Sequence, residues 1–188
     1  MRNLLVIVFY ACLFYACDET AIPHQKGYLR LELPPAKYKV FDPEGCPFKF
    51  EVSEKATLVP DTNSLSESCW WYINYPSFNA QIFLSYKTID NNFSAYAEDS
   101  RTLVYKHTQR ANSIEEEFIK NDFHASGILY SIGGDAASSV QFYMSDSSKH
   151  FLRGALYFNS APNSDSLAPV IQYIKKDIDR MLATLQWK

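Results

Sequence analysis

The chain lacks an excess of positive charge, and this absence excludes the usual basis of nucleic-acid binding. Its 188 residues contain 18 Lys and Arg against 21 Asp and Glu, so the formal net charge is -3. A nucleic-acid binder needs a basic face that neutralises phosphates. We therefore expect no nucleic-acid partner.

Sequence signatures of cofactor and metal binding are missing as well. No Gly-x-Gly-x-x-Gly sequence and no Walker lysine is present to hold a phosphate. None of the four histidines stands at a metal-ligand spacing from another: His24, His107, His124 and His150. We read His107 as a core histidine, because it continues the apolar stripe of a predicted helix. The sequence predicts neither a metal nor a cofactor.

A nucleophile elbow is also absent, since no Gly-x-Ser-x-Gly sequence occurs. Ser147, Ser148 and His150 lie beside Asp146, which gives a superficial likeness to a catalytic triad. Triads are assembled across a fold, and side chains this close in sequence seldom converge. We interpret them as polar residues of a turn between two strands and predict no enzymatic activity.

The first 16 residues differ from the rest, because they contain an uninterrupted apolar run from Leu4 to Ala16 after the single cation Arg2. This length fits a secretory signal and falls short of the ~20 residues that cross ~30 Å of hydrocarbon. Cys12 and Cys17 each follow an alanine, and a bacterial lipoprotein signal requires a small residue just before its cysteine. Cleavage before Cys17 leaves the polar start CDET, so Cys17 is the predicted lipidation site. The alternative is an ordinary cleaved signal without lipid.

The rest of the chain is predicted to form a tether, residues 17–27, and one globular domain, residues 28–188. About 170 residues suit a single domain with a real core. Two or more acyl chains hold a protein stably at a membrane surface. We therefore expect a cell-envelope protein, lipid-anchored to the inner or outer membrane, with its domain outside the cytoplasm.

Two cysteines remain after the signal, Cys46 and Cys69, and they bracket a polar loop at residues 60–68. Outside the cytoplasm an even number of cysteines is first read as a disulfide. Closing this loop of ~24 residues would stabilise the fold by about 3.5 kcal/mol in the chain-entropy model. The alternatives are two free buried thiols or a metal pair.

Alternation of apolar and polar residues predicts most of the strands, because successive side chains of a strand point to opposite faces. The predicted strands are residues 28–33, 48–52, two strands within 69–86 joined by a turn at Pro76-Ser77, 114–119, 127–132, 140–145 and 151–158. One face of the second strand in 69–86 carries Ala80, Ile82, Leu84 and Tyr86. We read Glu115, Glu116 and Glu117 as a solvated edge.

Two segments show apolar residues at helical spacing. The first starts at Asn91 or Asn92, and its stripe comprises Phe93, Tyr96, Ala97, Ser100, Leu103, Val104 and His107. The second is capped by Asp165 or Ser166, has Pro169 in its first turn and ends near Gln186. Its stripe comprises Leu167, Val170, Ile171, Ile174, Ile178, Met181, Leu182 and Leu185. These elements predict a single α+β domain, a mainly antiparallel sheet with two amphipathic helices packed on it. The finer prediction is a PsbP-like α/β/α sandwich.

Aromatic residues make up 15% of the chain, and four of them cluster at Trp70, Trp71, Tyr72 and Tyr75. Aromatic platforms bind saccharides, but aromatic residues paired across strands more often belong to a core. Both interpretations stay open at this point.

Several sequence blocks resemble the gliding-motility lipoprotein family GldD of Bacteroidota. The most specific is GGDAASSVQFYMSDSSKHFLRGALYF, followed by a helix that ends in TLQWK. The pieces YLRLELPPAKY, CPFKFEV, CWWYINYP and FLSYK are similar to the family in the same order. The resemblance covers nearly the whole chain after the signal.

The resemblance implies an envelope lipoprotein needed for gliding motility, with other gliding-motility and type IX secretion envelope proteins as partners. It implies neither an enzymatic activity nor a cofactor, so the expected role is that of a non-catalytic assembly or accessory factor. The alternative function is a surface lipoprotein that binds or processes envelope or environmental glycans.

Two interpretations explain the GGD to LYF block. Packing is the favoured one, in which Val140, Phe142 and Met144 meet Leu152, Leu156 and Phe158 of the next strand. The other is a partner surface formed by Gln141, Tyr143, Lys149, His150 and Arg153, and it predicts that charge reversal at Arg153 stops motility without lowering the melting temperature. Gly133, Gly134 and Asp135 are predicted to form a tight turn, since glycine reaches positive φ without steric cost.

Overall fold

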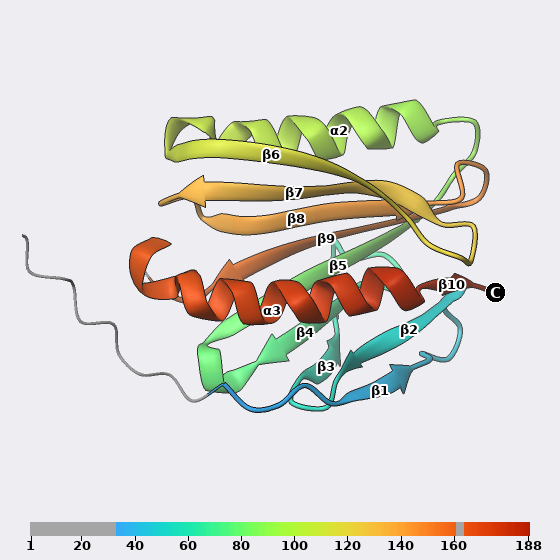
Figure 1. Cartoon of the computed structure of the whole chain (residues 1–188). Coiled ribbons are helices and arrows are strands. Elements are labelled where there is room, and N and C mark those ends of the chain that lie inside the picture. The colour runs from blue at the N-terminus through green and yellow to red at the C-terminus, as the bar shows by residue number, and fades with distance from the viewer. Residues whose placement is uncertain (1–32, 161–163) are drawn as a thin grey trace, which may run out of the picture.

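The computed structural model describes residues 33–160 and 164–188, which form two sheets and two long helices (Figure 1). The predicted signal, the tether with Cys17 and nearly all of the first predicted strand lie outside the described residues. The elements are β1 (Tyr38–Phe41), β2 (Phe48–Ser53), β3 (Thr57–Pro60), β4 (Trp71–Tyr75), η1 (Pro76–Phe78), β5 (Ala80–Thr88), α2 (Phe93–Tyr105), η2 (Lys106–Gln109), β6 (Ala111–Lys120), β7 (Ser126–Gly134), β8 (Ser138–Ser145), β9 (His150–Phe158), α3 (Ser164–Thr184) and β10 (Gln186–Trp187).

The larger sheet has seven strands in the order β3-β4-β5-β9-β8-β7-β6, and every neighbouring pair is antiparallel. The smaller sheet has the order β1-β2-β10 and is antiparallel too. The predicted α+β class is therefore confirmed. The turn predicted at Pro76-Ser77 is the short 3-10 helix η1, which joins β4 to β5.

One side of the large sheet is covered by α3 and by the small sheet, which lie side by side in Figure 1. The predicted stripe of α3 faces this core, where Ile174 and Ile178 are fully buried. The sheet contributes alternate residues such as Leu84, Phe142 and Leu152, each at most 1% exposed. Burying a side chain of this size contributes about 1.5–3 kcal/mol, so this larger core supplies most of the apolar stabilisation.

The other side of the large sheet is partly covered by α2, which packs on β7, β8 and β9 and forms a smaller core with them. Val104 of α2 is 1% exposed and contacts this core, which also contains Tyr130, Tyr143 and Phe151. Leu103, predicted in the same stripe, is instead 38% exposed. It lies about 100° round the helix from Val104, and the contact with the sheet is too narrow to include both.

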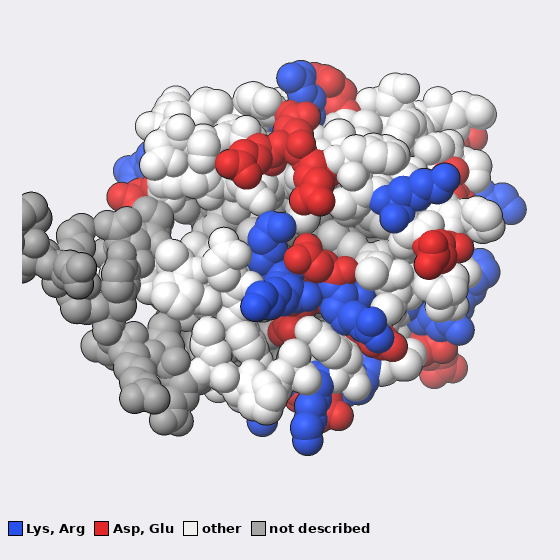
Figure 2. Space-filling view, in the orientation of Figure 1, with Lys and Arg blue, Asp and Glu red and all other residues white. Residues whose placement is uncertain are grey.

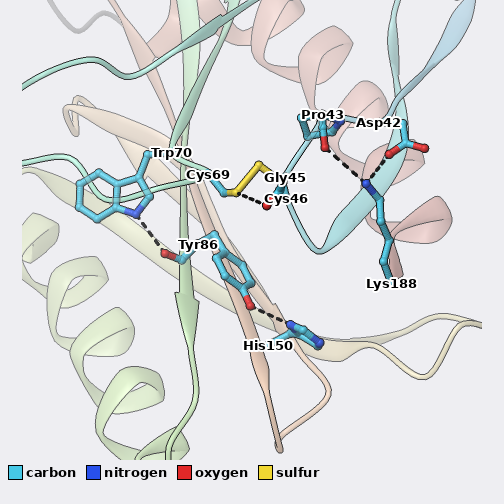
Figure 3. The surroundings of a disulfide bond; sticks show 9 residues. All are labelled: Asp42, Pro43, Gly45, Cys46, Cys69, Trp70, Tyr86, His150 and Lys188. Atoms are coloured by element: carbon cyan, nitrogen blue, oxygen red, sulfur yellow. Dashed lines mark hydrogen bonds and ion pairs between the residues drawn. A yellow bond between two sulfur atoms is a disulfide. The ribbon is translucent and has the colours of Figure 1, made fainter.

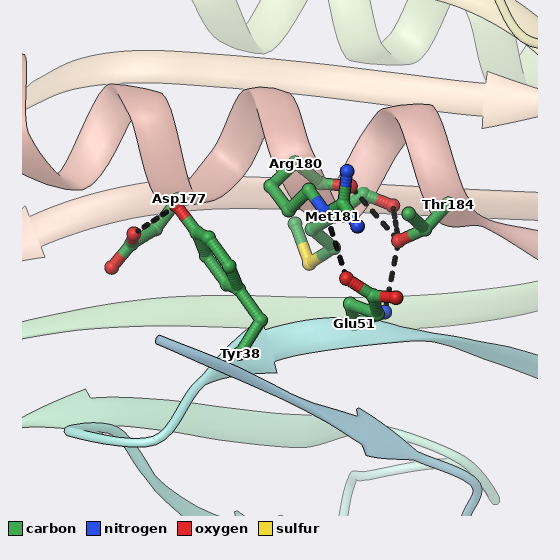
Figure 4. A network of polar contacts seen from close by, with 6 residues as sticks. All are labelled: Tyr38, Glu51, Asp177, Arg180, Met181 and Thr184. Atoms are coloured by element: carbon green, nitrogen blue, oxygen red, sulfur yellow. Dashed lines mark hydrogen bonds and ion pairs between the residues drawn. The ribbon is translucent and has the colours of Figure 1, made fainter. Parts of the chain in front are cut away.

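A polar network joins α3 to the small sheet (Figure 4). The Arg180 Nε donates to Oε2 of Glu51 at 2.7 Å, and the backbone N–H of Glu51 donates to Oγ1 of Thr184 at 2.9 Å. Tyr38 of β1 donates its hydroxyl to Oδ1 of Asp177 at 3.0 Å. These contacts fix how α3 sits over β1 and β2.

Two local predictions are corrected at Gly133 and Gly134 and at the ends of α3. Both glycines are the last residues of β7 and pair with β6, so the turn starts only at Asp135. Gly134 has φ +88°, and a Cβ there would lie 2.8 Å from the carbonyl oxygen of Arg110. Glycine is therefore required at this position because β6 lies close to it, and not because the residue belongs to the turn.

The helix α3 begins at Ser164, one residue before the predicted caps, so Pro169 lies in its second turn. It ends at Thr184, earlier than predicted, because Gln186 and Trp187 pair with β2 as β10.

Candidate interaction surface

The two cysteines that remain after the signal form a disulfide, with their Cα atoms 5.5 Å apart (Figure 3). This separation lies within the usual range of about 4.4–6.8 Å. Cys46 comes just before β2 and Cys69 just before β4. The bond therefore ties the small sheet to the large one, and neither free thiols nor a metal pair describes these residues.

The structure does not bring the five residues of the predicted partner surface together on the outside. Gln141 is 1% exposed and Tyr143 is 7% exposed, because the face of β8 that carries them lies beneath α2. The ring of Tyr143 stacks on that of Phe151 at 5.1 Å. Tyr143 belongs to the smaller core and Gln141 is buried on the same face of β8, which corrects the prediction that they form a partner surface.

Arg153 lies on the same side of the sheet and is largely enclosed. Its Nη2 donates to Oε1 of Gln141 at 2.6 Å. Burial lowers the pKa of the Arg153 guanidinium. The charge of Tyr157 and a hydrogen bond between the two side chains raise this pKa. Burial, and then the charge of Arg153, lower the pKa of His107 in η2. The expected charge reversal with an unchanged melting temperature assumed an exposed arginine, and the structure contradicts that assumption.

The remaining two residues of the set are Lys149 and His150. Lys149 is exposed in the loop between β8 and β9. His150 is half-buried, with its Nδ1 2.8 Å from the hydroxyl of Tyr86 (Figure 3) and its ring stacked on Trp187 at 5.1 Å. His150 therefore joins β9 to β5 and to the C-terminal strand.

Asp146 organises the loop between β8 and β9. Its Oδ1 accepts the backbone N–H groups of Ser148, Lys149 and His150 at 2.8–3.0 Å. Burial tends to raise the pKa of Asp146, but these three hydrogen bonds outweigh burial and lower the pKa to about 2. The carboxylate is thus used by the backbone, in agreement with our interpretation of this stretch as a turn.

Three aromatic side chains and a lysine lie on the α2 side of the large sheet, next to the area that α2 covers. We call them the aromatic surface: Trp70, Tyr72, Phe83 and Lys87. Tyr72 of β4 pairs with Phe83 of β5, and their ring centroids are 5.2 Å apart. Trp70 contacts Phe83 edge to face at 5.6 Å. The Lys87 ammonium lies 5.3 Å from the Trp70 ring centre. All four are partly exposed, because α2 packs on β7 to β9 and these residues belong to β4, β5 and the loop before β4.

The alternation of β4 divides the four aromatic residues singled out in the sequence. Trp71 and Tyr75 point to the larger core, where Tyr75 is 2% exposed and Trp71 packs on Phe41 at 5.0 Å. Trp70 and Tyr72 are on the outer side. Sequence reasoning missed Phe83 and Lys87, although both stand at the positions of β5 that alternate with its predicted core face. No group of three or more metal-ligating side chains occurs within the described ranges.

A helix on each side of an antiparallel sheet defines a PsbP-like α/β/α sandwich, and one solved structure shows the same arrangement. The solution structure of cyanobacterial PsbP (CyanoP) from Synechocystis sp. PCC 6803 is similar with a TM-score of 0.50 and 8% sequence identity, over 85% of this chain and 98% of that chain. At this identity the likeness shows the fold alone. Among curated proteins, none matches the chain.

The family is shown by sequence. The family model of the gliding motility lipoprotein GldD matches residues 18–187, so the chain belongs to the GldD family of gliding motility lipoproteins. Membership supports a role in gliding motility and attachment to the cell envelope as a lipoprotein. In the described part of the chain, no helix is both long and apolar enough to cross a membrane.

Proposed function

We propose that the chain is a non-catalytic assembly or accessory factor of the gliding and type IX secretion machinery, held at the envelope by lipid on Cys17. It acts by contacting other envelope proteins through the aromatic surface. The observation that carries this proposal is the partly exposed cluster of Trp70, Tyr72 and Phe83, in which the rings of Trp70 and Tyr72 both contact that of Phe83. Trp and Tyr are enriched at the energetic centres of protein interfaces.

The contacts of Asp146 and His150 support the part of the proposal that describes the chain as non-catalytic. Asp146 is held by three backbone N–H groups, and His150 is held by Tyr86 and Trp187. The Asp146 carboxylate also accepts a hydrogen bond from the Ser148 side chain, whereas the contacts of the His150 ring are with Tyr86 and Trp187. Catalysis would need a contact between a nucleophile and a base such as the His150 ring.

The alternative function is glycan binding on the same aromatic residues. A sugar ring stacks best on one flat aromatic face, whereas Trp70 and Phe83 meet at 87° and Tyr72 and Phe83 at 44°. The ammonium of Lys87 also lies over the Trp70 ring. This geometry favours an irregular protein surface as the ligand. Tight binding of an envelope saccharide that is lost in Trp70→Ala would favour the glycan function instead.

The test is complementation of a deletion strain with Tyr72→Ser combined with Phe83→Ser. We expect the strain to lose gliding and secretion of a type IX cargo protein while the lipoprotein stays at its normal level in the envelope. The matched control is Phe123→Ser combined with Val40→Ser, two apolar residues that are 42% and 65% exposed elsewhere on the surface. Normal gliding by the first double variant would refute the assignment of this surface.

A further inference from the structure

Arg153 is a largely enclosed cation without an acidic partner. It lies on the α2 side of the large sheet, and part of the residue stays exposed to solvent. None of the ion pairs among the described residues includes it. Figure 2 shows the more common arrangement on the face that carries α3, where Lys and Arg side chains are interspersed with Asp and Glu. Because enclosed charges in proteins are normally paired, the charge of Arg153 points to a partner from outside the domain.

Gln141 holds the guanidinium of Arg153 but does not neutralise it. Its Oε1 accepts the hydrogen bond from Nη2 of Arg153 at 2.6 Å. Its Nε2 has no hydrogen-bond partner within the described ranges, although the side chain is only 1% exposed. A glutamate of the same shape would neutralise Arg153 and would leave no donor unpaired. The amide therefore orients the guanidinium while its positive charge remains available to a ligand.

Hydroxyl groups and a histidine surround Arg153. Tyr157 of β9 forms a hydrogen bond with the guanidinium, and the charge of Arg153 acts on His107 of η2. Ser85 of β5 pairs directly with Arg153, so the two side chains are neighbours on the same side of the sheet. All three neighbours are partly exposed. An anion bound to Arg153 would therefore lie among groups that can donate further hydrogen bonds to it.

The electrostatic field around Arg153 is positive. Burial and then the charge of Arg153 lower the pKa of His107, and no acidic side chain of the described ranges counteracts them there. Burial and then Glu116 raise the pKa of the neighbouring Tyr143. The Glu116 carboxylate is itself paired with Nε of Arg101 at 3.8 Å. A bound anion would therefore be attracted, without a free carboxylate that competes for Arg153.

The position beside Arg153 adjoins the aromatic surface. Phe83 and Lys87 lie two residues before and two residues after Ser85 in β5, so all three point to the same side of the sheet. The ammonium of Lys87 is already paired with Glu67, whereas the ring of Phe83 is partly exposed. An anionic group that is carried next to an apolar or aromatic group fits these surroundings.

We propose that Arg153 is the centre of a binding site for a single carboxylate group, carried by a small molecule or by a protein chain. The planar guanidinium matches the two oxygens of a carboxylate, and one cation balances its one negative charge. A phosphate group, with a charge of about −1.5 to −2, would need a second cation. Gln141 is a positioning residue of this site. The inference goes beyond the proposed function, because it assigns an anion site that lies outside the aromatic surface and whose assay needs no gliding cell.

The test is an NMR titration of the isotope-labelled, detergent-solubilised full chain at constant ionic strength and neutral pH. The probes are N-acetylphenylalanine with its terminal carboxylate, N-acetylglutamate α-amide with its side-chain carboxylate, and N-acetylphenylalanine amide, which has no carboxylate. We expect the carboxylates to shift the Arg153 Nε–H and His107 ring signals saturably, and the neutral amide to shift neither. The carboxylate that binds more tightly shows whether a chain terminus or an acidic side chain is preferred. A saturable shift with the neutral amide, tighter binding of inorganic phosphate, or no saturable shift with either carboxylate would overturn the proposal.

Variants of the site separate binding from folding, with the His107 ring signals as the readout. Arg153→Met should weaken carboxylate binding by about tenfold or more. The matched control Lys149→Met removes the same charge from an exposed position and should change binding by less than about twofold. Gln141→Glu gives Arg153 an internal carboxylate, so it should abolish binding while the melting temperature stays at or above that of the wild-type chain. Equal weakening by Lys149→Met and Arg153→Met would mean that net charge alone matters, and unchanged binding by Gln141→Glu would equally refute the site.

Discussion

The two sides of the large sheet differ in how they are held together. On the α3 side, a large apolar core is reinforced by the disulfide and by the network of Tyr38, Glu51, Asp177 and Arg180. On the α2 side the core contains fewer buried side chains. Stability therefore resides mainly on the α3 side, and the α2 side is expected to open at lower free energy.

The difference also concerns what is left uncovered. Each helix covers part of the sheet, so two areas remain. These are the aromatic surface on the α2 side and, on the other side, a hollow between β6 and α3. One offers partly exposed aromatic rings, and the other is lined by carboxylates, by Lys175 and by apolar side chains. The two sides of the domain therefore present surfaces of different chemistry.

The largest expected effect comes from truncating a matched phenylalanine on each side. Phe142 and Phe151 are 1% and 3% exposed, and such substitutions to alanine cost about 3–5 kcal/mol. Phe142→Ala should lie near the upper end and Phe151→Ala near the lower end. The ring of Phe142 covers Gly154, which has no side chain to fill the cavity. Phe151 instead contacts Phe93 and Tyr96 of α2, a single helix that can move toward the sheet. Urea denaturation measures both.

A second substitution sharpens this prediction. A Cβ at Gly154 would lie 2.1 Å from Cζ of Phe142, so Gly154→Ala should strongly destabilise the wild-type chain. The same change should be mild when residue 142 is already alanine, because the new methyl group then fills part of the cavity. Additive effects, or the reverse order of Phe142 and Phe151, would contradict the comparison of the two sides.

The next largest effect is removal of the disulfide by Cys46→Ser combined with Cys69→Ser. In the chain-entropy model this lowers the free energy of unfolding by about 3.5 kcal/mol. Because the bond joins the small sheet to the large one, amide protection should fall first in β1 and β2 and change little in α2. Reduction of the wild-type chain with dithiothreitol is the control and should reproduce the pattern. A uniform loss of protection would show that the bond does not act on one side.

A smaller effect is expected from Arg153→Met. This change removes the hydrogen bond to Gln141 and leaves its Oε1 unpaired beneath α2, which costs about 2 kcal/mol. Thermal unfolding should show the loss, and the exposed Lys149→Met should change stability by less than about 0.5 kcal/mol. If both variants melted like the wild-type chain, Arg153 would be a surface residue after all.

The sequence predicted the elements whose pattern is local. The alternation in β2, β4, β5 and β9 and the stripe of α3 identify these elements and their buried faces, because one side of each is apolar. β1 was not predicted, since its two central residues are exposed and it depends on β2 and on a contact between Tyr38 and Asp177, which are 139 residues apart.

The prediction of a partner surface that includes Gln141 and Arg153 was wrong for a related reason. Gln141 and Arg153 are polar residues on the face opposite a clear apolar stripe, and such residues normally face water. Here α2 covers that face, and only the placement of a distant helix reveals it. The aromatic surface could have been found in part, because the alternation of β5 places Phe83 opposite its core face. The hollow between β6 and α3 could not be predicted, since it depends on how α3 lies beside β6.

The smallest expected effect tests the polar network that holds α3, through Asp177→Asn. Asp177 is 3% exposed, and burial raises the pKa of its carboxyl group against the hydrogen bonds from Tyr38, Tyr75 and Ser53 that lower it. The folded chain therefore binds this proton more tightly than the unfolded chain does. The stabilisation that comes from protonated Asp177 is fully present below the pKa of this group in the unfolded chain. It is lost as the pH rises through the pKa in the folded chain.

At pH 7 the buried carboxylate is charged, which destabilises the folded chain, whereas an asparagine amide at this position is neutral. We expect Asp177→Asn to be slightly more stable than the wild-type chain, by about 1 kcal/mol, and this advantage should shrink as pH falls below the folded pKa. Asp177→Ala, which leaves the Tyr38 hydroxyl without its acceptor, should be less stable at every pH. Urea denaturation between pH 4 and 8 measures the difference, with Asp99→Asn on exposed α2 as the control. A growing advantage of the Asn variant at low pH would mean that the network stabilises the charged form, and that α3 is held by an ionised carboxylate.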